Sequence, residues 1–231
     1  MALVLAWLAG VLQRQVLASS PWSAGLVLTL TLAALQIGSM VGPLRFLRRA
    51  ALLEQETSGR PRLAWRYVSA PWFHRRNGEA LVNVLLLALI LGPTPLALDQ
   101  VVLRYALTAL ACLTLAALMA NHQGLRHQVW GGASGVVGAL VGLAAGLSLL
   151  HWRVIGFSIG EISVPAWVLL VVAGSLQLAW IPPRSDPGDP GTPGQRLLAS
   201  TWWWGLMLGL GWAALSWASQ LLQAWLRHRP G

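Results

Sequence analysis

The chain has 231 residues, of which 56% are hydrophobic and only 10% are charged. Since a soluble domain carries about 25% charged residues, this composition excludes a soluble enzyme, a nucleic-acid-binding domain and a disordered chain. The formal net charge is +9, and all 16 basic residues are arginine. Half of them lie within residues 45–76 beside apolar stretches, which favours contact with lipid headgroups over binding of nucleic acid.

Six apolar stretches come close to the roughly 20 residues that a helix needs to cross a hydrocarbon core. Because lipid offers the backbone no hydrogen-bond partners, we predict that each of them is a helix. The sequence therefore predicts an all-α membrane protein with a single membrane domain over residues 24–224. The predicted spans are Ala24–Val41, Ala80–Leu98, Val101–Ala120, Gly132–Leu150, Pro165–Ile181 and Thr201–Leu222.

Four further segments flank or connect these spans. Residues 1–23 contain an apolar run broken by Gln13-Arg14-Gln15, which predicts an extra N-terminal interfacial helix, with a seventh span as the alternative. Residues 42–78 form a long connection rich in arginine and tryptophan, which we expect to pack in the membrane interface. Residues 182–200 are rich in proline and glycine and predict a flexible connection. Residues 225–231 form a short basic tail.

Few residues are available for disulfide or metal chemistry. The one cysteine, Cys112, lies in an apolar stretch. No cluster of histidine, cysteine and carboxylate residues has the spacing of metal ligands. We therefore expect no disulfide, no metal and no cofactor.

The most informative motif is a serine flanked by glycines at the start of the fourth predicted span, Gly132-Ala133-Ser134-Gly135. Such glycines let a substrate backbone approach a nucleophilic hydroxyl, and N–H groups at a helix start can hold an oxyanion. The alternative is simple helix packing, because Gly138 and Gly142 form a small-xxx-small face. The motif by itself leaves both interpretations open.

The position of this motif resembles the rhomboid family of intramembrane serine proteases. Rhomboids have six helices, a long interfacial first loop and a Gly-x-Ser-Gly at the start of the fourth helix. Their first loop carries a Trp-Arg pair and a structural histidine, and here Trp65-Arg66 and His74 stand in the corresponding places. The resemblance implies a rhomboid-like six-helix bundle.

Two more helices carry matching positions. The second rhomboid helix begins with His-x-x-x-Asn, and this chain has Glu79 and Asn83 at that spacing. The last rhomboid helix carries its catalytic histidine three residues before a Gly-x-x-x-Gly. Here Gly205 and Gly209 supply the glycines, and Trp202 stands at the histidine position. The resemblance therefore covers the chain from about the first to the last predicted span.

The family implies roles for several of these residues. Ser134 corresponds to the nucleophile or is its remnant. The oxyanion would be held by the Asn83 side chain and by backbone N–H groups at Gly132 and Ser134. The same resemblance implies a transmembrane segment of another protein as substrate or client, in a lipid bilayer. The arginine-only basic set suggests the inner membrane of a bacterium.

Three departures affect the implied chemistry. The indole N–H of Trp202 only donates hydrogen bonds, so this residue cannot act as a base. Glu79 puts a carboxylate where the family has an oxyanion-binding histidine. Gly138 replaces the aromatic residue that packs on the catalytic histidine, so we expect the Trp202 indole to fill the space over Gly138.

Whether the chain is an enzyme depends on a base for Ser134. The first hypothesis is a pseudoprotease that holds or sorts transmembrane clients without cutting them. The alternative is an active serine endopeptidase in which His127, seven residues before Ser134, takes the proton. A third reading, a transporter or assembly subunit, is weakened because the spans contain few charges beyond Arg104 and Glu79.

Overall fold

The computed structural model describes residues 23–40, 45–55, 60–92, 96–125, 128–151, 156–159, 162–180 and 191–227. The predicted N-terminal helix and His127 lie outside these ranges.

Six apolar helices correspond in order to the six predicted spans. They are α2 (Ala24–Gly38), α5 (Asn77–Leu91), α6 (Leu98–His122), α7 (Ser134–His151), α8 (Ala166–Trp180) and α10 (Thr201–Arg227). By length and composition, α6, α7 and α10 are sufficient to cross a membrane, whereas α2, α5 and α8 are apolar but shorter. The prediction of an all-α membrane bundle is confirmed.

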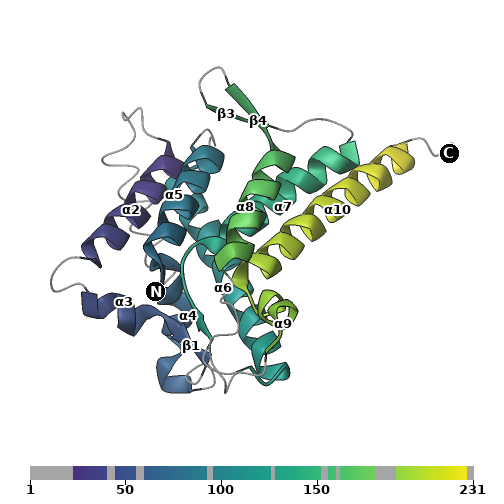
Figure 1. Cartoon of the computed structure of the whole chain (residues 1–231). Helices are drawn as coiled ribbons and strands as arrows, with labels where there is room; N and C mark the ends of the chain where they lie inside the picture. The colour runs from purple at the N-terminus through teal and green to yellow at the C-terminus, as the bar shows by residue number, and fades with distance from the viewer. Residues whose placement is uncertain are drawn as a thin grey trace.

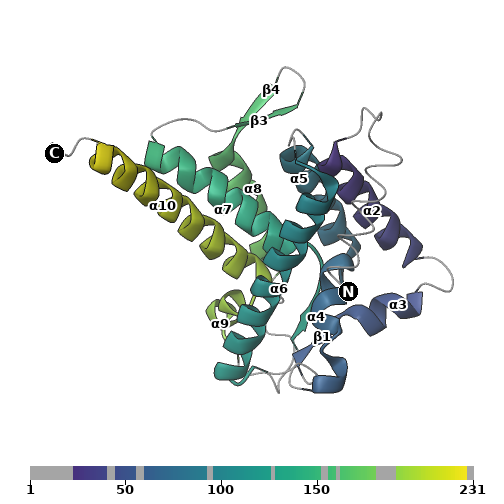
Figure 2. The ribbon, with the colours of Figure 1, turned by 180° about the vertical axis from the view of Figure 1, so that it is seen from behind.

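The six helices form two groups around α6. Figures 1 and 2 show α2 and α5 side by side on one flank, α7, α8 and α10 on the other, and α6 between them. Buried leucine and valine side chains such as Leu28, Leu87 and Val137 fill the space between the groups. Tyr105 of α6 is also buried there and donates its hydroxyl to the carbonyl of Pro71 at 2.6 Å. This bond ties the first connection to the central helix.

Helices α7 and α10 pack along each other through their glycines. A Cβ atom built on Gly205 would overlap the Gly135 carbonyl, and one built on Gly209 would overlap that of Ala139. From the α7 side, a Cβ on Gly142 would lie 2.6 Å from the Leu206 carbonyl oxygen. Small residues thus bring the two backbones into contact, as is common between membrane helices. We refer to this contact as the α7/α10 seam.

The first connection contains short elements rather than one long helix. They are α3 (Arg45–Ala51), β1 (Leu53–Glu54), η4 (Pro61–Leu63), α4 (Arg66–Ser69) and η5 (Ala70–Trp72). Strand β1 pairs antiparallel with β2 (Val129–Trp130), which leads into α7. This pairing places the first connection beside the start of α7.

Three segments differ from the sequence-based expectation. Within the predicted flexible connection 182–200, Pro193–Leu198 form helix α9, since Thr192 and Gln195 make a reciprocal capping box. The predicted tail over residues 225–231 begins inside a helix, because α10 continues to Arg227. The antiparallel pair β3 (Gly156–Ile159) and β4 (Ile162–Pro165) joins α7 to α8 and was not predicted.

Candidate functional site

Ser134 is the first residue of α7 and follows a tight turn. Gly132 in this turn has a φ of +81°, a backbone conformation that glycine adopts without strain. Its N–H donates to the carbonyl of Ala70 at 2.8 Å. A Cβ atom at Gly132 would overlap the imidazole ring of His74. The glycine is therefore required by the turn and by the close approach of His74.

His74 holds this turn in place. Its Nε2 accepts the backbone N–H of Ala133 at 3.0 Å, and its own backbone N–H donates to Gln36 Oε1 at 3.0 Å. The side chain is fully buried, and this burial lowers the pKa of His74 to about 4. The imidazole is therefore neutral near pH 7, and its acceptor nitrogen is occupied. His74 positions the backbone before Ser134 and is not available as its base.

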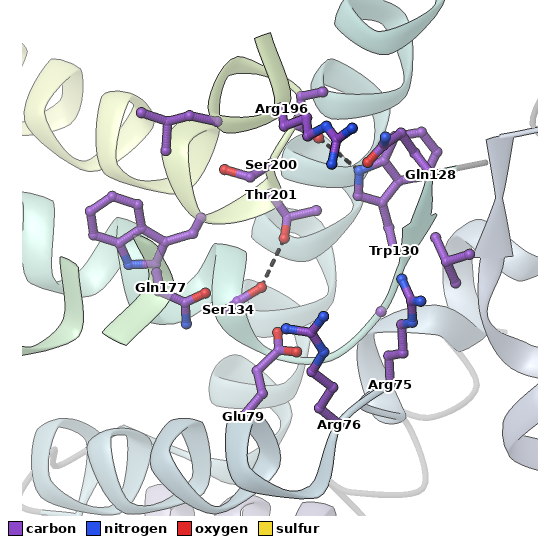
Figure 3. Close-up of a pocket in the computed structure, with 15 residues that line it drawn as sticks. Arg75, Arg76, Glu79, Gln128, Trp130, Ser134, Gln177, Arg196, Ser200 and Thr201 are labelled. Atoms are coloured by element: carbon purple, nitrogen blue, oxygen red, sulfur yellow. Dashed lines mark hydrogen bonds between the residues drawn. The ribbon is translucent and has the colours of Figure 1, made fainter. Parts of the chain in front are cut away.

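The hydroxyl of Ser134 is paired with another hydroxyl. Its Oγ lies 2.8 Å from Oγ1 of Thr201, the first residue of α10, and either oxygen can donate (Figure 3). Both residues are buried. A threonine hydroxyl is not basic enough to take a proton from a serine hydroxyl near pH 7. Thr201 is therefore not the base that would activate Ser134.

Trp202 is buried between helices and reaches past Gly138. A Cβ atom on Gly138 would lie 2.5 Å from the Trp202 carbonyl oxygen, whereas one on Gly174 of α8 would lie 3.4 Å from the indole ring. The two positions are neighbours, but the main chain of α10 lies over Gly138 and the ring extends to α8. The three atoms nearest a Cβ at Gly138 belong to the main chain of Trp202 and Leu206, so whether the indole also fills this space stays a prediction.

A cavity of about 120 Å³ opens at the N-terminal ends of α7 and α10. Figure 3 shows Glu79 and Arg76 pointing from the start of α5 toward Ser134, with Arg196 and Ser200 on the opposite side. Among the described residues that line it, the charged ones are Arg75, Arg76, Arg196 and Glu79. The described part of the lining thus holds three arginines and one carboxyl group.

Asn83 lies one helical turn beyond Glu79 on α5. It is fully buried, and its Oδ1 accepts Nε2 of Gln177 at 3.3 Å. Its Nδ2 has no hydrogen-bond partner within the described residues. Gln177, on α8, lines the cavity, whereas Asn83 does not. Asn83 is thus linked to the cavity through Gln177.

Trp65 and Arg66 do not line this cavity. Arg66 forms an ion pair with Glu54 of β1 at 3.3 Å, and its guanidinium lies 6.0 Å from the ring centre of Trp65. This pair ties α4 to β1. The sequence places both residues in a structural loop motif, and their contacts agree with such a role.

Several cavity residues were missed at the level of sequence, among them Thr201, Gln177 and Arg196. Thr201 directly precedes Trp202, and Gln177 is a polar residue in an apolar span, so both offered a signal. Arg196 belongs to a connection that was expected to be flexible and offered none. His127 lies outside the described residues, and Gln128, which follows it, lines the cavity. In the described part of the chain, no group of metal-ligating residues is found.

A comparison with protein-family models gives a match. The family model described as Rhomboid domain matches residues 61–217, which include the cavity, α7 and the start of α10. No curated protein matches the chain.

Proposed function

Since this chain belongs to the rhomboid family and is an integral membrane protein, we propose that it is a pseudoprotease, which binds or sorts transmembrane clients without cutting them. The observation that carries this proposal is the partner of Ser134. A serine attacks a peptide bond only when a base removes its proton. The Ser134 hydroxyl is instead bonded to Thr201, and the histidine position of the last helix holds Trp202.

The oxyanion side of the cavity supports the same proposal. Proteolysis needs donors aimed at the negative charge that develops on the scissile carbonyl. Here the Glu79 carboxylate points toward Ser134 from the start of α5. A carboxylate repels an oxyanion when it is ionised, and when it is protonated it offers one hydrogen-bond donor in place of the imidazole of the family. The cavity is therefore poorly arranged for peptide hydrolysis.

The outer faces of α5 and α8 suit the binding of another helix. Leu81 and Leu85 of α5 are exposed, as is Leu178 of α8. Between these helices runs the hydrogen bond from Gln177 to Asn83. A single polar bond opens more easily than the glycine-lined contact between α7 and α10. A client helix that docks here would bring its end to the cavity.

The alternative function is an active intramembrane serine endopeptidase. It is favoured by one observation, that Gln128 lines the same cavity as Ser134 and directly follows His127. In that case His127 would be the base, and removal of its imidazole would abolish cleavage.

Reconstituted protein distinguishes the two functions. Wild type, Ser134→Ala and His127→Ala are incubated in liposomes with a panel of transmembrane substrates, and products are detected by mass spectrometry. A photocrosslinking amino acid at Leu81 records client binding in the same liposomes, with one at Leu149 of α7 as the control. We expect crosslinks at Leu81 and no cleavage. Cleavage that is lost in both Ser134→Ala and His127→Ala would establish the protease instead.

A further inference from the structure

Helix α3 leaves the bundle at the level where the membrane helix α2 ends. Ile37 and Met40, at the end of α2, are both exposed, and their apolar side chains gain free energy by facing hydrocarbon. Arg45 begins α3 only five residues after Met40. Figures 1 and 2 show α3 projecting sideways from the bundle beneath α2. This position puts α3 in the interface, where lipid headgroups meet the hydrocarbon.

The inner face of α3 is fixed to the bundle. Ala51 is buried there, and Arg48 donates to Asn77 Oδ1 at 3.3 Å and to the Arg75 carbonyl at 2.9 Å. Asn77 Oδ1 also accepts Nε2 of Gln36, on α2, at 3.1 Å. These bonds join α3 to the end of α2 and to the start of α5. The opposite face of α3 is left to the surroundings.

This outer face combines arginines with an aromatic ring. Arg45 and Arg49 lie one helical turn apart and are both exposed, and Phe46 beside them is 63% exposed. Exposed arginines by themselves are typical of a solvated surface. A phenylalanine among them is not, because its ring gains free energy by leaving water. The combination is typical of a helix that lies in the membrane interface, with its ring among acyl chains and its guanidinium groups among phosphates.

We propose that the outer face of α3 binds anionic phospholipids, and that Arg45 and Arg49 make it prefer them to zwitterionic ones. An anionic headgroup lacks the ammonium group that balances the phosphate of phosphatidylcholine, so each arginine near it gains attraction. A guanidinium can also form two parallel hydrogen bonds with phosphate oxygens. Through Arg48, the bound lipid holds the start of α5 in the interface. This inference goes beyond the proposed function and does not depend on it.

The test uses the full chain in nanodiscs of mixed phosphatidylcholine and phosphatidylglycerol. A trace of either lipid carries a photoactivatable diazirine next to its headgroup, and crosslinked peptides are quantified by mass spectrometry. Wild type is compared with Arg45→Gln/Arg49→Gln. The matched control is Arg60→Gln/Arg62→Gln, which removes two exposed arginines of the same connection outside α3. Both variants therefore carry the same net charge.

We expect the phosphatidylglycerol probe to label residues 45–51 of wild type and of the control about tenfold more than the phosphatidylcholine probe does. In Arg45→Gln/Arg49→Gln the two probes should label these residues equally. A preference that survives in this variant would overturn the proposal. An equal loss in the control would assign the preference to the total charge of the connection and would overturn it too. Absence of label from both probes would mean that α3 lies outside the interface.

Two further measurements separate the ring from the charges. In Phe46→Gln both probes should label α3 less, while the preference for phosphatidylglycerol persists, because the ring inserts among acyl chains of either lipid. Added salt should lower the preference of wild type, since exposed charges are screened. Unchanged labelling in Phe46→Gln would contradict insertion of the ring. A preference that does not respond to salt would contradict recognition by charge.

Discussion

The α7/α10 seam and the cavity at its N-terminal end are built by the same two helices from opposite kinds of residue. The seam is lined by glycines whose missing Cβ atoms let two backbones touch. The cavity carries three arginines, a glutamate and a pair of hydroxyls. The seam needs small residues whether or not the protein cuts anything, while catalysis needs a base at one atom. The glycine contacts of the seam therefore do not indicate whether the cavity is catalytic.

The largest expected effect is in the seam. In Gly205→Ala the new Cβ would overlap the Gly135 carbonyl, and neither backbone can move without separating the helices. We expect the free energy of unfolding to fall by about 3 kcal/mol, measured by equilibrium denaturation in mixed micelles. Gly211→Ala is the matched control on the same helix, since a Cβ at Gly211 meets nothing within 4 Å. Equal stability of the two variants would show that the seam is not closely packed.

The next largest effect is a pH dependence of stability that arises from His74. The pKa of folded His74 is about 4, against 6.5 ordinarily. Between these values the unfolded state binds more protons, so stability is complete above pH 6.5 and falls as the pH falls toward 4. The loss reaches up to about 3 kcal/mol.

The comparison is with His74→Gln, whose side-chain oxygen can still accept the Ala133 N–H but does not titrate. Stability is measured across this pH range for both proteins. The loss of stability toward pH 4 should be smaller in the variant, because the variant lacks the titration of His74. Parallel profiles would mean that His74 is not buried and neutral.

The hydrogen bond between Ser134 and Thr201, where the seam meets the cavity, should contribute less to the free energy of unfolding. Thr201→Val and Ser134→Ala each remove one partner of the 2.8 Å bond. In a double-mutant cycle we expect a coupling of about 1 kcal/mol, measured by the same denaturation method. Strict additivity of the two substitutions would show that the hydroxyls are not bonded to each other.

The smallest expected effect is a local change in hydrogen exchange at helix α9, which lies beside the cavity. Trp130→Phe removes the hydrogen bond that holds Ala199, the residue after α9. Hydrogen exchange should become faster over residues 193–200 and stay unchanged along the seam. Trp212→Phe, on the exposed face of α10, serves as the control. Faster exchange in the seam as well would mean that the two regions are coupled.

The sequence predicts the seam better than it predicts the cavity. A long apolar stretch in a membrane is nearly always a helix, so the six helices could be predicted from the sequence. The spacing of the glycines predicted the contacts between helices. The cavity depends on groups that only the fold brings together. Thr201 lies 67 residues after Ser134 and forms a hydrogen bond with it. Arg196 arrives on a short helix within a segment rich in proline and glycine. Thr201 is marked in the sequence only by its place beside Trp202, and no local signal marks Arg196.

The activation of Ser134 distinguishes the two functions, and a fluorophosphonate probe tests it most directly because it reacts with any activated serine regardless of substrate. Wild type, Ser134→Ala and Ser200→Ala in liposomes are incubated with the probe near pH 8, and the intact mass of each is measured. Since the Ser134 hydroxyl is paired with Thr201 and not with a base, we predict no mass gain in any of them. A gain in wild type and Ser200→Ala that is absent from Ser134→Ala would contradict the pseudoprotease.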